Sequence, residues 1–190
     1  MGTRMTNTGA GSSAMPDKAP SEAANLERAF SLVNQAMHTV ALQRRRLAGQ
    51  EPEDVEFPMR PWADWEFFIT ALWRLRRRAQ IAARTQTGGK HVRQAIAAFD
   101  AELPDLKLLR DVAEHIDEYA VDNPKRHHPA VSRKELQVGS WNESVLTWQL
   151  LFTDSGQSRT LNADAAYASA ERLYLAVRSV RDGARPGSVI

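Results

Sequence analysis

Apolar residues recur at helical spacing along most of this chain, and that periodicity constrains its fold more than any other feature. Steps of three, four and seven residues place side chains on one side of an α-helix. The pattern predicts five amphipathic helices. Their apolar faces are Leu26, Phe30, Val33, Met37, Val40 and Leu47; Trp65, Phe68, Ile69, Leu72, Leu75, Ala79 and Ala83; Val92, Ala95, Ile96, Phe99 and Leu103; Leu106, Leu109, Val112, Ala113, Ile116 and Ala120; and Tyr167, Ala170, Leu173, Tyr174, Val177 and Val180.

Glycine, proline and asparagine residues indicate where these helices begin and end. The first helix spans residues 21 to 48 and stops at Gly49, and the second starts at Pro61, because proline is favoured in a first helical turn. Gly88-Gly89 precedes the third helix. The fourth runs from Pro104 to the Asn-Pro pair at 123–124, and the Asn162 side chain can cap the last.

One segment changes to the alternating period of a β-strand. Leu146, Trp148, Leu150 and Phe152 alternate with their neighbours, and Asp154-Ser155-Gly156 has the composition of a turn. We predict a hairpin of residues 145–153 and 157–161, with a third strand at 135–138. The expected fold is therefore mainly α: an antiparallel bundle of about five helices with a β-hairpin inserted before the last helix.

Composition favours one globular domain. The chain has 190 residues, 43% of them hydrophobic and 25% charged, which is a globular balance. We predict a single domain at residues 21–183 between disordered segments at 1–20 and 184–190. With no cysteine, disulfides, thiolate nucleophiles and cysteine-ligated zinc are excluded. The sequence shows neither a signal peptide nor a membrane-spanning stretch, so we expect a cytoplasmic protein without membrane contact.

Charge is segregated although the net charge is only +2. Residues 67–99 contain seven cations and no acid, whereas residues 100–123 contain eight acids and two cations. One interpretation is a nucleic-acid-binding surface formed by Arg74, Arg77 and Arg78. The other is that a basic helix packs beside an acidic one. Arg76 lies within the apolar stripe, so it needs a carboxylate partner, which the acidic helix can provide, or a route to solvent.

The fourth helix carries the residues best suited to chemistry. Asp111 and His115 are four apart on a continuous helix, where the carboxylate can orient the imidazole for general acid–base catalysis. The planar guanidinium of Arg110 suits a phosphate and the charge that develops on it during transfer. Arg110, Asp111 and His115 together have the chemistry to cut a phosphodiester without a metal ion or cofactor.

An arginine followed by a polar residue and a histidine on the penultimate helix of a small bundle resembles the HEPN superfamily. The resemblance covers about residues 21–121 and the last helix, and leaves the hairpin unexplained. It implies a metal-independent ribonuclease, often a toxin of a toxin–antitoxin or defence system. It also implies a homodimer whose two motifs meet at the interface, where Arg110 stabilises the phosphate, Asp111 takes the polar position and His115 moves the proton. RNA and an antitoxin or other protein are the implied partners. Where the family more often has asparagine, this chain has Asp111.

Other interpretations use the same residues without catalysis. Arg110 with Glu114, and Asp111 with His115, are also ordinary helical ion pairs, which would make the protein a non-catalytic interaction module of the same fold. A third interpretation is a basic helical nucleic-acid binder. The aromatic residues from Trp62 to Trp73 are more typical of a core than of a base-stacking surface. His38 is expected to be packed or interfacial, and His127-His128 lacks a third metal ligand nearby.

Overall fold

The computed structural model describes residues 20–49, 60–115, 136–142, 146–152 and 158–184. In these ranges the elements are α1 (Glu22–Leu47), α2 (Arg60–Ala82), α3 (Gly89–Glu102), α4 (Leu106–Glu114), β1 (Leu136–Asn142), β2 (Thr147–Phe152), β3 (Ser158–Asn162) and α6 (Ala163–Gly183). The predicted fold class, a helical bundle with a hairpin before the last helix, is confirmed. The tails expected at 1–20 and 184–190 lie almost wholly outside the described residues.

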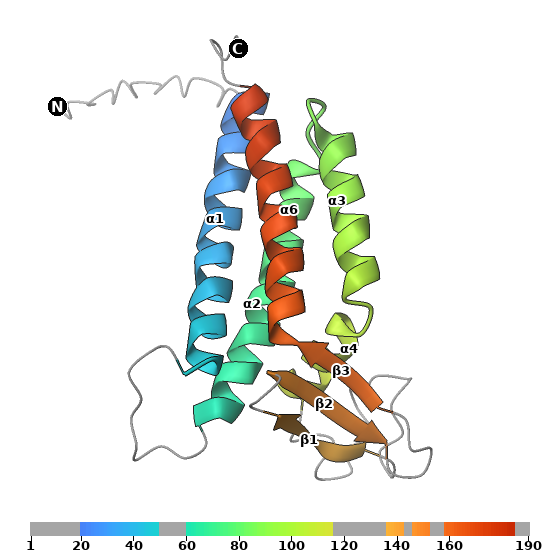
Figure 1. The fold of residues 1–190 in the computed structure, drawn as a ribbon. Coiled ribbons are helices and arrows are strands. Elements are labelled where there is room, and N and C mark those ends of the chain that lie inside the picture. The colour runs from blue at the N-terminus through green and yellow to red at the C-terminus, as the bar shows by residue number, and fades with distance from the viewer. Residues whose placement is uncertain (1–19, 50–59, 116–135, 143–145, 153–157, 185–190) are drawn as a thin grey trace, which may run out of the picture.

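Helices α1, α2, α3 and α6 stand side by side with alternating direction, and the sheet and α4 lie together at one end of them (Figure 1). Helix α2 packs against α1, α3, α4 and α6, while α6 also packs against α1 and α3. The apolar faces predicted from the sequence meet in one core, where Val33, Phe68, Leu72, Val92 and Val177 are each fully buried. Helix α2 is therefore the central element of the bundle.

Local hydrogen bonds explain the helix starts. Ser21 Oγ accepts from the Ala24 N–H at 3.2 Å, and Asn162 Oδ1 accepts from the Ala165 N–H at 2.9 Å, so the predicted asparagine cap is confirmed. Gly88 precedes α3 in a left-handed conformation with φ 76°. A Cβ there would overlap the side chain of Val180 on α6, so this close approach of loop and helix requires glycine.

The sheet is an antiparallel meander in the order β1-β2-β3. Its hairpin β2–β3 was predicted, and β1 extends beyond the predicted third strand to Asn142. Leu146 precedes β2 as a turn residue with φ 46° instead of opening the strand, because its carbonyl receives the N–H of Ala163 at 2.8 Å, which joins the strand to the start of α6. Trp148 of β2 is 3% exposed and its ring lies 4.7 Å from that of Trp62 on α2.

The fourth helix ends before His115, although the sequence pattern predicts that it continues to residue 123; residues 116–123 lie outside the described ranges. Its apolar face at Leu106, Leu109 and Val112 is buried as expected, but α4 ends at Glu114. His115 is its C-cap, with φ −128°, and donates its backbone N–H to the Val112 carbonyl at 3.2 Å. Acidic residues dominate the sequence from Glu114 to Glu118, and carboxylates oppose the dipole at a helix C-terminus. The continuous helix through His115 was therefore a wrong prediction.

A buried carboxylate connects the end of α1 to the start of α2. Asp64 is 3% exposed, and its two oxygens accept from Arg46 Nε at 2.6 Å and from Arg60 Nε at 3.3 Å. In the sequence, Asp64 lies near the start of α2, where a carboxylate complements the helix dipole. Burial instead makes it the counter-ion of two arginines, so the charge of this one carboxylate holds the corner between two helices.

Replacing this carboxylate should destabilise the fold strongly. We expect Asp64→Asn to lower the free energy of unfolding by about 3 kcal/mol, because the buried Arg60 loses the charge that compensates its burial and Arg46 loses its ion-pair partner. Urea denaturation followed by circular dichroism measures the change. The matched control is Asp164→Asn, whose carboxylate pairs with Arg44 at 2.7 Å but is 57% exposed, and which should cost at most about 1 kcal/mol. Equal losses in the two variants would contradict the assigned role of Asp64.

Candidate functional site

Arg110 is bound into the molecule by its own helix and by α2. Its Nη1 donates to Glu114 Oε2 at 2.7 Å and lies 3.1 Å from Asp111 Oδ1. The guanidinium lies over the ring of Trp73, 5.3 Å from the centroid, and the side chain is 19% exposed. The Nε atom is buried and has no hydrogen-bond partner. The side chain thus connects α4 to α2 through a cation–π contact whose charge is balanced by two carboxylates.

The structure brings together part of the predicted motif. Arg110 and Asp111 form an ion pair, and the Arg110–Glu114 pair expected of a surface helix is confirmed. His115 follows directly after the last helical residue. Its side chain therefore does not have the regular helical spacing from Asp111 on which the predicted orientation of the imidazole depended.

A second arginine shares the Trp73 ring. Arg76 lies 5.3 Å from its centroid and donates Nε and Nη2 to the two oxygens of Asp100, each at 2.6 Å. Hydrogen bonding to Asp100 raises the pKa of Arg76 above its ordinary value, against the opposing effect of burial. The carboxylate partner that the sequence required is present, but it comes from α3 and not from the fourth helix. The expected packing of the basic helix beside the acidic one is confirmed by the contact of α2 with α4 and not by this pair.

The three arginines predicted to bind nucleic acid are in different environments. Arg78 is half-buried and donates Nη1 to the Leu32 carbonyl of α1 at 2.8 Å, so it fastens two helices together. Arg74 and Arg77 are exposed, and in the described part of the chain neither has an ion-pair or hydrogen-bond partner. Two of the three guanidinium groups are thus available to an external anion.

Arg74 lines a groove of about 350 Å³ between α1, α2 and α4. Its walls are Thr39 and Gln43 of α1, Glu66, Phe67, Thr70, Ala71 and Arg74 of α2, and Ala113 and Glu114 of α4. Most of the aromatic residues from Trp62 to Trp73 are at least half-buried, as predicted, but Phe67 is 60% exposed. Sequence reasoning missed Gln43, although its spacing from Val40 and Leu47 puts a polar residue within the apolar stripe of α1.

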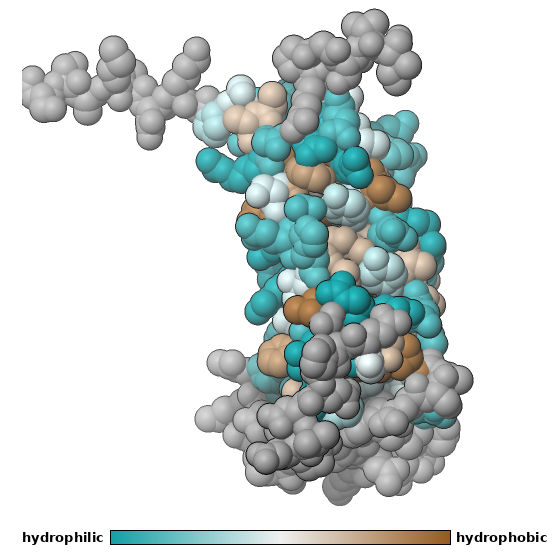
Figure 2. All heavy atoms as spheres, turned by 60° about the vertical axis from the view of Figure 1, so that its left-hand side comes forward, coloured by the Kyte–Doolittle hydropathy of each residue, from teal (hydrophilic) through white to brown (hydrophobic). Residues whose placement is uncertain are grey.

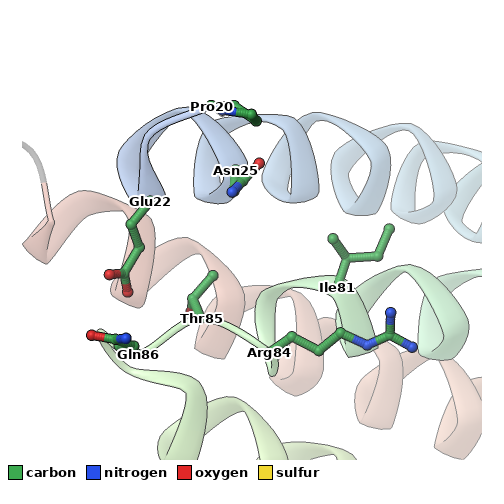
Figure 3. Close-up of a pocket in the computed structure, with 7 residues that line it drawn as sticks. All are labelled: Pro20, Glu22, Asn25, Ile81, Arg84, Thr85 and Gln86. Carbon is green, nitrogen blue, oxygen red and sulfur yellow. The ribbon is translucent and has the colours of Figure 1, made fainter. Parts of the chain in front are cut away.

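Two other hollows lie along the bundle. One of about 430 Å³, at the opposite end from the sheet, is lined by Pro20, Glu22, Asn25, Ile81, Arg84, Thr85 and Gln86 (Figure 3). Its Glu22 carboxylate accepts the backbone N–H of Thr87, which ties α1 to the loop before α3. The other, of about 200 Å³ between α1 and α6, is lined by His38, Tyr167 and Tyr174 among others. His38 is exposed, so of the two expectations for it, packed or interfacial, the packed one is wrong and the interfacial one stays a prediction.

The visible surface of the bundle is mostly hydrophilic, with separate apolar patches (Figure 2). The exposed large apolar residues are Leu42, Phe67, Ile81 and Leu175. Within the described ranges no helix has both the length and the apolar character to span a membrane. Among the same residues, no three His, Asp or Glu side chains form a group that would hold a metal ion. His127-His128 lies outside the described residues.

Comparisons with known proteins identify no relative. No protein-family model matches the chain, and searches of curated proteins and of solved structures found no match either.

The position of Arg110 predicts a measurable contribution to stability. Arg110→Met should lower the free energy of unfolding by about 1–2 kcal/mol, because it removes the cation over Trp73 and the pair with Glu114. Arg77→Met, which removes an exposed arginine of α2, should change it by less than about 0.5 kcal/mol. Parallel urea titrations measure both. If Arg110→Met is as stable as Arg77→Met, Arg110 has no structural role.

Proposed function

We propose that this protein is a non-catalytic, HEPN-like helical module that binds RNA through the exposed arginines of α2. The observation that carries the proposal is a contrast between arginines. Arg74 and Arg77 are exposed and without partners in the described part of the chain, whereas Arg110 is held by Glu114, Asp111 and Trp73.

Electrostatics support this division of roles. The charge of Arg110 is already compensated by ion pairs with Glu114 and Asp111, and a phosphate would have to displace these carboxylates to reach the guanidinium. Arg74 and Arg77 carry no such compensation, so phosphates can displace the counterions around them. The exposed ring of Phe67 lies on the same helix and offers a surface on which a base can stack.

A metal-independent ribonuclease is the second candidate, because Arg110 and Asp111 are in contact at 3.1 Å and His115 follows them at the end of α4. In this candidate a phosphate displaces the carboxylates from Arg110, and His115 transfers the proton. Assembly as a homodimer and inhibition by an antitoxin or other protein partner belong to this second candidate.

RNA binding should depend on salt and on the two exposed arginines. For a mixed-sequence single-stranded RNA, log affinity falls linearly with log salt concentration. This slope should become shallower by roughly 1.4 in the Arg74→Ala/Arg77→Ala double variant, since each phosphate contact contributes roughly 0.7. Fluorescence anisotropy over a salt series measures this slope. The control is Arg28→Ala/Arg178→Ala, which removes two exposed arginines of α1 and α6 and should keep the wild-type slope. A double variant of α2 that binds like this control would refute the assignment.

Digestion of total RNA without metal ions distinguishes the two candidates. The proposed module binds RNA and leaves it intact, both as wild type and as His115→Ala. Cleavage by the wild type with cyclic-phosphate ends, lost in His115→Ala while that variant remains folded, would replace the proposal with the ribonuclease.

A further inference from the structure

Gln43 is a buried amide without a partner. Its side chain lies in the apolar stripe of α1 and is 9% exposed, and its Oε1 is buried without a hydrogen bond. No other interaction engages the side chain within the described structure. An unsatisfied buried amide costs folding free energy, so Gln43 is a poor choice for the fold alone. Gln43 is one of the residues that line the groove between α1, α2 and α4.

The α2 wall of this groove adds an aromatic surface and a cation. Phe67, Thr70 and Arg74 follow one another at steps of three and four, which places them along one side of the helix. Phe67 is the most exposed of the large apolar side chains in the described residues. Arg74 is the groove's cation, and no described carboxylate neutralises it.

The two acidic residues of the groove are already engaged. Glu66 accepts the indole N–H of Trp62 at 2.8 Å, and Glu114 accepts from Arg110 at 2.7 Å. Each carboxylate has a second oxygen with lone pairs left for a hydroxyl donor. The groove is therefore lined by an amide side chain, an exposed aromatic ring, an unpaired guanidinium and two carboxylates that can each accept from a hydroxyl.

We infer that this groove binds an adenosine monophosphate unit, with the base on Phe67 and Gln43 and the phosphate on Arg74. A glutamine amide can pair with the adenine edge, accepting from the exocyclic amine and donating to a ring nitrogen. Rotation about its broad terminal torsion lets the amide turn Oε1 toward the base. A carboxylate that accepts the ribose 2′-hydroxyl is an established mode of ribonucleotide binding, and a volume of about 350 Å³ lies within the range of small-ligand sites.

The unit can come from two sources, a free adenine nucleotide or an adenosine within single-stranded RNA. The inference goes beyond the proposed RNA binding, because the base contacts assign a preference that phosphate contacts do not. It also holds if the protein binds free nucleotides and no RNA.

Isothermal titration calorimetry of the full chain tests the site with AMP, adenosine, GMP, dAMP, inorganic phosphate and a short oligoadenylate. We expect AMP to bind at least about tenfold more tightly than GMP, because guanine presents an oxygen where adenine presents an amine. Phe67→Ala should weaken AMP binding about tenfold through lost stacking. Arg74→Ala should weaken AMP without affecting adenosine, and Arg77→Ala, outside the groove walls, is the control. Binding of AMP alone, of oligoadenylate alone or of both identifies the source and supports the site.

Gln43→Leu separates binding from folding. Because it removes an unsatisfied buried amide, its urea midpoint should equal or exceed that of the wild type, while the preference for AMP over GMP should be lost. Equal affinity of the wild type for AMP and GMP, or an unchanged preference in Gln43→Leu, would overturn the inference. The inference would also be overturned if the groove bound an acidic polymer such as polyglutamate through Arg74 and bound no adenine ligand. RNA binding to Arg74 and Arg77 without adenine preference would refute this site and leave the proposed function intact.

Discussion

The fold depends first on the central position of α2. The apolar residues of this helix are buried against α1, α3, α4 and α6. A helix so placed has little solvent-facing surface, yet this one carries many arginines. Those near the core can remain charged only beside a carboxylate, a carbonyl or an aromatic ring. Asp64, Asp100, the Leu32 carbonyl and the Trp73 ring supply these partners, so satisfying the arginines also fixes the neighbouring helices.

Because buried arginines need such partners, Arg110, which the sequence suggested for catalysis, also stabilises the fold. Arg76 and Arg110 approach the same Trp73 ring from α2 and α4. Asp100 compensates the charge of Arg76, and Glu114 compensates that of Arg110. Arg74 and Arg77 lie outside that network. The groove beside Arg74 contains Gln43, a buried polar group that the fold does not satisfy, and such exceptions to hydrogen-bond satisfaction call for an explanation outside folding.

Much of the fold could be predicted because it follows from local chemistry. The apolar faces, the Asn162 cap and the hairpin before α6 are encoded within a few residues of where they act. The extent of α4 was harder to predict, since its apolar period continues past His115 while the acids at its end oppose the helix dipole. The pair of Arg110 with Glu114 was predicted correctly, but the predicted pair of Asp111 with His115 depended on that boundary.

The sequence alone determined five amphipathic helices, a strand pair and the segregation of charge, because periodicity and turn chemistry are short-range properties. Only the tertiary structure decided which arginines remain available. Arg74, Arg76, Arg77 and Arg78 are nearly equivalent as sequence, yet Arg76 reaches Asp100, Arg78 reaches the Leu32 carbonyl, and Arg74 and Arg77 face solvent. Partners distant along the chain made that difference, since a helix presents successive residues in directions about 100° apart and each direction meets a different neighbour.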